Sequence, residues 1–165
     1  MTVAAVILSV APGSALGDAD GLARVRRLAD VAWSGGAMPV IVVTPDPDGS
    51  VAVALAGAEV TLASPAPEES GPAAQMAHGV EIALGEVSET TAALLWPARL
   101  CWVGPETVTS LIEAHGATPD ALVQPAYHGA TGWPRLVPLH LVDGLRRVAP
   151  DRMPDDVLSD LAASG

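Results

Sequence analysis

A glycine-containing loop near the start of the chain has the spacing of a phosphate-binding loop. It lies in VILSVAPGSALGDADGLARVRR, residues 6–27, between an apolar run and an amphipathic segment. A loop that joins a strand to a helix can offer backbone N–H groups to an anion, and we expect Ala11, Gly13 and Ser14 to provide them here. The plainer alternative is a connection whose glycines only allow the turn. The loop 9–17 contains neither Arg nor Lys, which favours this alternative.

A second group of charged and reactive residues lies in PARLCWVG, residues 97–104. The guanidinium group of Arg99 could hold a phosphate or a carboxylate directly. It could instead pair with Asp18 or Asp20 and close the site, which the acidic composition favours. Cys101 is expected to be packed and inert, because only Arg99, two residues away, could lower the pKa of its thiol.

The remaining candidates are histidines and tryptophans. The chain has four histidines, His78, His115, His128 and His140. Their spacing is not that of metal ligands, so we do not predict a metal site. Helical phase turns His78 toward the expected cleft, and the others are expected on the surface or at helix ends. Three tryptophans lie in or near loops where strands end: Trp96, Trp102 and Trp133. They could stack on a nucleobase or a pterin, or fill the core or an interface.

Apolar runs and amphipathic stretches alternate along the chain. Strands are predicted at 3–10, 38–44, 51–55, 58–63, 91–96 and 120–127, and helices at 20–34, from Pro72 to about 87, and at 105–115, 139–148 and 154–163. Residues 128–137 are expected to form a hairpin or an extended excursion. This alternation predicts a three-layer α/β/α fold with a mostly parallel sheet. Ligands bind such sheets where the strands end, which gives the loops 9–18, 44–50, 63–72, 97–104 and 126–134.

Composition restricts the function classes. The 165 residues suit one domain, 1–165, and the net charge of −11 includes eight arginines but no lysine. An acidic chain without a basic stripe is not expected to bind nucleic acid. Apolar runs are too short for a membrane helix, and the N-terminal run lacks the basic residues of a signal peptide. The single cysteine excludes an intramolecular disulfide, which fits a reducing cytoplasm. Because neither a membrane helix nor a signal peptide is predicted, we expect a soluble, cytoplasmic protein.

Four segments in order resemble the MobA-like nucleotidyltransferases, which join a nucleotide to the molybdenum cofactor or to related phosphorylated small molecules. They are VILSVAPGSALG (6–17), SGPAAQMAHGVEIAL (70–84), LLWPARLCWVGPETVTSLIEAH (94–115) and VQPAYHGATGWPRLVP (123–138). The resemblance covers nearly the whole chain and implies the Rossmann-like nucleotidyltransferase fold.

The resemblance also shows where this chain departs from the family. In the family, an Arg and a Lys of the first loop neutralise the triphosphate, and an Asp after the fourth strand holds Mg²⁺. The matching positions here are Ala15, Asp20 or Gly21, and Arg99. Two further motif positions, a Pro and a His in the family, are Cys101 and Trp133. Glycines and prolines of the motifs are retained, whereas the charges that bind the metal and the phosphates are lost.

These departures predict a non-catalytic member of the family, a pseudoenzyme that binds a partner or a small ligand in its cleft. The alternative is an active, divergent nucleotidyltransferase that transfers CMP or GMP from an NTP. Only that alternative implies CTP or GTP with Mg²⁺. Ligands could be a nucleotide or another phosphorylated small molecule, a protein partner or a second copy of the chain. The candidate nucleotide-binding residues are Leu8, Ser9, Val10, Ala11, Gly13, Ser14, Gly17, Gly71, Pro72 and Arg99.

Overall fold

A five-stranded sheet forms the centre of the computed structural model, which describes residues 1–19 and 21–164. Its strands, in spatial order, are β5 (Thr61–Ala63), β4 (Val40–Val43), β1 (Thr2–Leu8), β6 (Thr90–Pro97) and β9 (Arg135–Pro138). The first four are parallel, and β9 runs antiparallel to β6. The prediction of a mostly parallel sheet is therefore confirmed.

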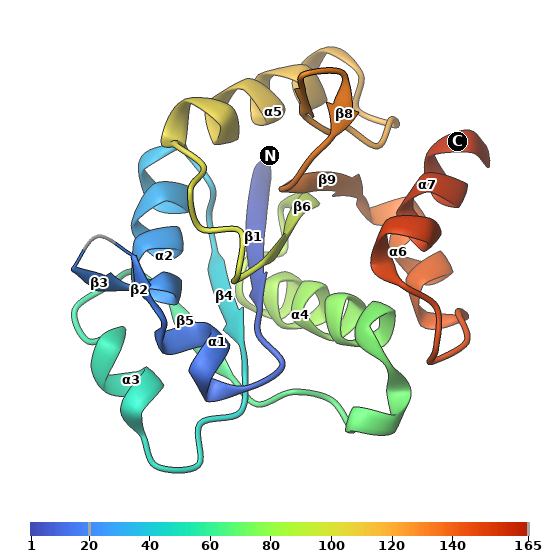
Figure 1. Cartoon of the computed structure of the whole chain (residues 1–165). Helices are drawn as coiled ribbons and strands as arrows, with labels where there is room; N and C mark the ends of the chain where they lie inside the picture. Colours follow the sequence, from blue (N-terminus) through green and yellow to red (C-terminus); the bar gives the residue numbers. More distant parts are fainter. Residues whose placement is uncertain (20, 165) are drawn as a thin grey trace.

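Helices cover both faces of this sheet (Figure 1). On one side lie α2 (Arg24–Ser34) and α5 (Pro105–Ala117), and on the other α4 (Pro72–Glu86), α6 (Leu139–Arg146) and α7 (Pro154–Ser164). Side chains of β1 alternate between two apolar clusters, with Ala5 and Ile7 facing α2 and Val6 facing α4. A strand buried on both faces explains the continuous apolar run at the start of the chain.

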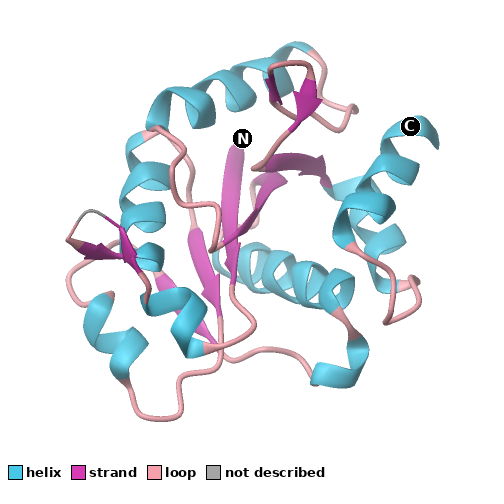
Figure 2. Ribbon diagram, in the orientation of Figure 1, coloured by secondary structure: helices cyan, strands magenta, loops and turns pink. Residues whose placement is uncertain are grey.

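Shorter elements lie around the central sheet (Figure 2). They are α1 (Pro12–Leu16), α3 (Ser50–Ala54), the 3₁₀ turn η1 (Glu68–Ser70), the ribbon β2 (Asp18–Ala19) with β3 (Leu22–Ala23), and the ribbon β7 (Ala126–Tyr127) with β8 (Ala130–Thr131). No helix among residues 1–19 and 21–164 combines the length and the apolar character that a membrane span requires.

One predicted strand, 51–55, is a helix in the structure. Asp46 explains the difference, because its two carboxylate oxygens accept hydrogen bonds from the amides of Val51 (2.9 Å) and Ala52 (3.0 Å). These amides have no acceptor within a helix that begins at Ser50, so a carboxylate in front of the first turn favours α3 over a strand. A short apolar run does not by itself distinguish the two.

The segments predicted as a helix at 20–34 and a strand at 120–127 also differ from the predictions. The helix expected from residue 20 begins at Arg24, because Asp18–Ala19 and Leu22–Ala23 form a small antiparallel ribbon in front of it. The strand expected at 120–127 is reduced to an isolated bridge at Val123 and the two residues of β7. Both segments pair with neighbours that sequence periodicity does not reveal.

His115, expected at the surface, is buried in the last turn of α5. Its Nε2 lies 3.0 Å from the hydroxyl of Thr91, whereas Nδ1 has no hydrogen-bond partner within the described part of the chain. Burial lowers the pKa of this imidazole, an effect that the charge of Asp120 partly opposes. The folded state therefore favours neutral His115.

We expect the stability of the protein to fall as the pH drops below about 6.5, the usual pKa of histidine. There the unfolded chain gains a proton that folded His115 does not, and the free energy of unfolding declines by up to about 1.4 kcal/mol per pH unit. The decline ends below the lowered pKa. Urea unfolding at pH 5–8 measures it: His115→Gln should flatten the curve, and His140→Gln, at an exposed site, should not. Equal curves for the wild type and His115→Gln would contradict this expectation.

Candidate functional site

The loop after β1 lies at the carboxyl edge of the sheet, where the parallel strands end. Leu8 closes β1, and the hydroxyl of Ser9 donates to the carbonyl of Ala11 at 2.6 Å. The amide of Ser14, expected to face a ligand, donates instead to the carbonyl of Ala11 at 3.1 Å in the first turn of α1. Val10 is 89 % exposed at the tip of the loop. The loop is thus mostly a short turn of helix, and ligand contacts by its amides stay a prediction.

Ala15 is completely buried. It faces the apolar cluster on the α2 side of the sheet, together with Leu28 and Val51. The resemblance aligns this position with an arginine of the first loop, yet the structure gives it no access to solvent. The packing of α1 therefore leaves no space for a cationic side chain at position 15.

The side chain of Arg24, the first residue of α2, packs against Gly17. A Cβ atom on Gly17 would lie 2.8 Å from Cζ and Nε of Arg24, and the amide of Arg24 donates to the carbonyl of Gly17 at 2.9 Å. Arg24 was not among the predicted site residues. An arginine at the start of the helix after a glycine loop is the sequence signal that could have identified it.

The loop 97–104 is anchored from three sides. The amide of Ala98 donates to the carbonyl of Leu8 (2.8 Å), which holds this loop against the end of β1. The indole Nε1 of Trp96 donates to the carbonyl of Leu100 (2.9 Å). From α2, Nε of Arg27 donates to the carbonyl of Cys101 (2.7 Å). The loop is therefore a fixed support for the residue at its turn, Arg99.

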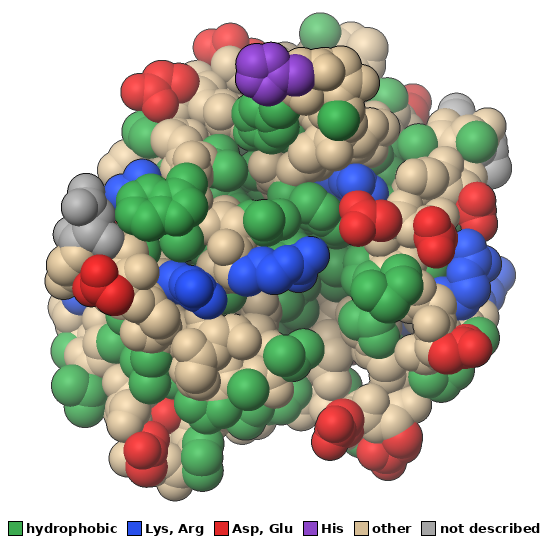
Figure 3. All heavy atoms as spheres, viewed as in Figure 1, with side chains coloured by type: hydrophobic (Ala, Val, Ile, Leu, Met, Phe, Trp, Pro, Cys, Tyr) green, Lys and Arg blue, Asp and Glu red, His purple; other side chains and the backbone are tan. Residues whose placement is uncertain are grey.

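Arg99 is exposed on this support. The predicted pair with Asp18 is wrong, because none of the ion pairs formed by residues 1–19 and 21–164 includes Arg99. Asp20, the other predicted partner, lies outside the described residues. Figure 3 shows basic side chains across the middle of this face and acidic ones mainly around its rim. Arg99, in the loop 97–104, and Arg24, at the start of α2, lie at this edge.

Gly71 and Pro72 begin α4 at the same edge, but a segment of the C-terminal part covers Gly71. Gly71 has φ of +86°, and a Cβ there would lie 2.5 Å from the carbonyl oxygen of Pro150. The preceding loop is tied to α4 as well, since Gln75 bonds both backbone groups of Ala66 and His78 Nε2 lies 2.9 Å from the carbonyl of Ser64. Gly71 is therefore a packing position, and its contact with a ligand stays a prediction.

The three tryptophans are separated by their burial. Trp96 is fully buried, and Trp133 is 7 % exposed with the guanidinium of Arg135 4.3 Å from its ring centroid. Trp102 is 66 % exposed and lies beside Arg27, whose Cζ is 5.0 Å from its ring centroid. Of the three, Trp102 is the one that can stack on a ligand. Cys101 is buried beside it, which confirms the predicted packing.

Comparison with known proteins identifies the family. A family profile described as a MobA-like NTP transferase domain matches residues 15–164. This chain belongs to that family. The sequence has no significant match among the curated proteins.

Several solved structures share the fold of this MobA-like protein. Rv0371c from Mycobacterium tuberculosis H37Rv, in a complex with manganese, has a TM-score of 0.73 and 19 % identity, covering 100 % of this chain and 84 % of that one. A 4-diphosphocytidyl-2C-methyl-D-erythritol synthase has a TM-score of 0.73 and 16 % identity, over 97 % and 84 %. CMP:2-keto-3-deoxy-manno-octonic acid synthetase complexed with CTP has a TM-score of 0.65 and 14 % identity, over 96 % and 83 %. The Rossmann-like nucleotidyltransferase fold is thereby confirmed.

The residues of this MobA-like protein do not fit a magnesium ion at the carboxyl edge. Mg²⁺ takes oxygen ligands, usually one or two carboxylates besides phosphates and water. The resemblance aligns Arg99 with the metal-binding Asp of the family, and no cluster of three or more His, Cys, Asp or Glu suited to a metal occurs in the described parts of the chain. A guanidinium group there repels a divalent cation and attracts the anion that the cation would have bridged.

Proposed function

We propose that this MobA-like protein is a non-catalytic member of its family that binds a phosphorylated small molecule at the carboxyl edge without Mg²⁺. The observation that carries the proposal is Arg99, an exposed guanidinium free of ion pairs within the described residues and held on an anchored loop. A guanidinium fork donates two parallel hydrogen bonds to phosphate oxygens. It supplies the charge that a metal-bridged phosphate would otherwise need.

Arg24 supports the proposal from the neighbouring loop. Its side chain lies against Gly17, and no ion pair within residues 1–19 and 21–164 neutralises it. A side chain that already packs against the backbone, as Arg24 does, loses little conformational freedom when an anion binds. In the proposed site the arginines hold the phosphate by charge and hydrogen bonds, and no metal promotes displacement at the α-phosphate.

The second candidate is an active, divergent nucleotidyltransferase that transfers CMP or GMP from CTP or GTP to the molybdenum cofactor or a related phosphorylated molecule. It is favoured by the retained fold, and by manganese and CTP in structures of similar proteins. Nucleotide binding that requires Mg²⁺, together with release of pyrophosphate when CTP or GTP is supplied with a phosphorylated acceptor, would support it.

Isothermal titration of CTP, GTP and ATP, each with Mg²⁺ or with EDTA, tests the proposal. We expect at least one nucleotide to bind in EDTA, without tightening in Mg²⁺. Arg99→Gln should weaken this binding about tenfold or more, since a hydrogen bond to a charged group contributes about 1.5–3 kcal/mol.

Arg147→Gln is the matched control, because Arg147 is an equally exposed arginine at the end of α6. It removes the same charge outside the loops of the carboxyl edge and should leave the affinity unchanged. Equal losses in the two variants, or binding only with Mg²⁺, would overturn the proposal. So would the absence of binding by all three nucleotides.

A further inference from the structure

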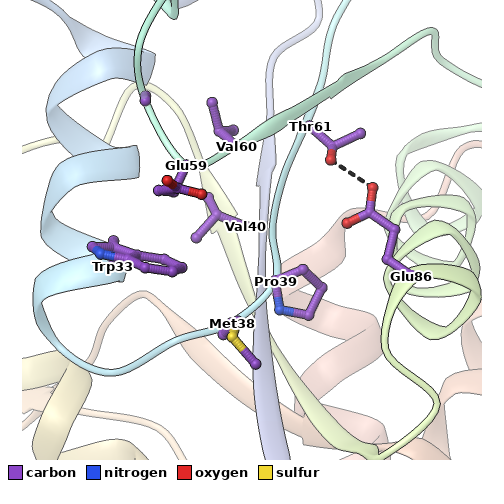
Figure 4. Close-up of a pocket in the computed structure, with 9 residues that line it drawn as sticks. Trp33, Met38, Pro39, Val40, Glu59, Val60, Thr61 and Glu86 are labelled. Atoms are coloured by element: carbon purple, nitrogen blue, oxygen red, sulfur yellow. Dashed lines mark hydrogen bonds between the residues drawn. The ribbon is translucent and has the colours of Figure 1, made fainter.

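A surface hollow of about 300 Å³ lies at the other end of the sheet, where β4 and β5 begin. It is lined from α2 by Trp33, from the start of β4 by Met38, and from the start of β5 by Glu59 and Thr61; Glu86 contributes from the end of α4. Figure 4 shows Trp33 and Glu59 on one side of the hollow and Thr61 with Glu86 on the other. None of its lining residues belongs to the loops of the carboxyl edge.

The two carboxylates in this wall lack a cationic partner. Neither Glu59 nor Glu86 takes part in an ion pair within the described residues, and no arginine or histidine lines the hollow. The hydroxyl of Thr61 donates to Oε1 of Glu86 at 2.5 Å, which orients this carboxylate and leaves its second oxygen available. The carboxylates come from separate elements, so the fold brings them to one hollow.

Helix ends add to the negative potential. α2 ends at Ser34, next to Trp33, and α4 ends at Glu86 itself. The last carbonyl groups of a helix carry a partial negative charge that favours cations. Three of the last carbonyls of α2 already accept backbone amides, so the two carboxylates and the end of α4 supply most of the negative potential.

The apolar part of the wall includes the indole ring of Trp33, which is partly exposed to solvent. Trp33 is 47 % exposed and Met38 is 40 % exposed. An indole face attracts a cation that sheds part of its hydration shell, and it binds Arg-like ions especially well because they are planar. A hydrated metal ion would make no use of this surface.

We propose that this hollow binds a small organic cation with a guanidinium head group. The planar head group stacks on Trp33 and donates hydrogen bonds to the carboxylate of Glu59 on the same side, while the carboxylate of Glu86 attracts it from across the hollow. A quaternary ammonium ion suits the wall less well, because it cannot donate hydrogen bonds and is bound by cages of several aromatic rings. This site is independent of the proposed phosphate site, since it shares no residue with it.

Titration with methylguanidinium chloride, followed through the indole N–H signals in ¹H–¹⁵N spectra, tests the proposal. Trp33→Phe assigns the signal of Trp33. We expect a saturable shift of that signal in the wild type, and affinities five- to tenfold weaker in Glu59→Gln and Glu86→Gln. Glu113→Gln, at an exposed site on α5, removes the same charge elsewhere and should bind like the wild type.

A shift that never saturates, or that sodium chloride reproduces at equal ionic strength, would overturn the proposal. So would an equal loss of affinity in Glu113→Gln. Acetyl-arginine amide distinguishes a free guanidine from an arginine side chain of a protein. Tighter binding of methylguanidinium supports the small-molecule occupant, and binding of the arginine derivative alone contradicts it.

Discussion

Substituting arginine for Ala15 should lower the free energy of unfolding by about 4 kcal/mol or more, because a charged group would be forced into a dry site. Ala15 has no exposed surface and faces an apolar cluster that includes Leu28 and Val51. The longer side chain would also overpack α1 against α2 and α3. An arginine at position 15 is therefore expected to unfold the loop and not to bind a phosphate.

Gly13→Arg is the matched control for this prediction. Gly13 lies in the same short helix but is exposed, and a Cβ there would meet no atom within 4 Å. We expect its urea midpoint to stay near that of the wild type, whereas Ala15→Arg should shift the midpoint far downward or leave no folded baseline. A wild-type midpoint for Ala15→Arg would show that α1 moves easily and that its packing does not exclude the family's arginine.

The second large effect is expected at Gly79, where α4 crosses the sheet. A Cβ on Gly79 would lie 2.3 Å from Cγ1 of Val6 in the central strand and 3.2 Å from Cγ2 of Val43. Both valines are buried, so neither can move away without disturbing the sheet. Gly79→Ala should therefore destabilise the protein by about 1–3 kcal/mol, as measured by urea unfolding.

Gly85→Ala provides the comparison on the same helix. A Cβ at Gly85 meets nothing within 4 Å, so alanine only gains helix propensity there. We expect a stabilisation of up to about 1 kcal/mol. The two substitutions are chemically identical, and opposite signs would locate the effect in the contact with Val6. A gain of stability at both positions would mean that α4 does not lie as close to the sheet as the structure describes.

Much of the fold could be predicted from the sequence because its main elements are strongly marked. β1, β4 and β6 are apolar runs buried on both faces, and α4 and α5 begin at Pro72 and Pro105, a favoured first-turn residue. The elements that were wrong are short. α3 depends on the carboxylate of Asp46, and residues 120–125 lack a strand partner beyond one bridge.

The site was only partly predictable. The exposure of Arg99 follows from a polar residue in a loop between apolar neighbours. The burial of Ala15 and the cover of Pro150 on Gly71 depend on contacts between segments distant in sequence, whereas the contact of Arg24 with Gly17 is local. The surface hollow where β4 and β5 begin is lined by four segments that are distant in sequence, so neither Glu59 nor Glu86 was recognisable as part of a site.

The place of β1 in the sheet has a consequence for synthesis on the ribosome. β1 is made first, yet it is the central strand, and Ala5 lies between Val40 and Leu94. Its second neighbour, β6, is complete only at Pro97. At about 5–20 residues per second, an apolar segment stays without its full cover for roughly 5–20 seconds. The central strand of the finished sheet is thus open to wrong partners while the chain is being made.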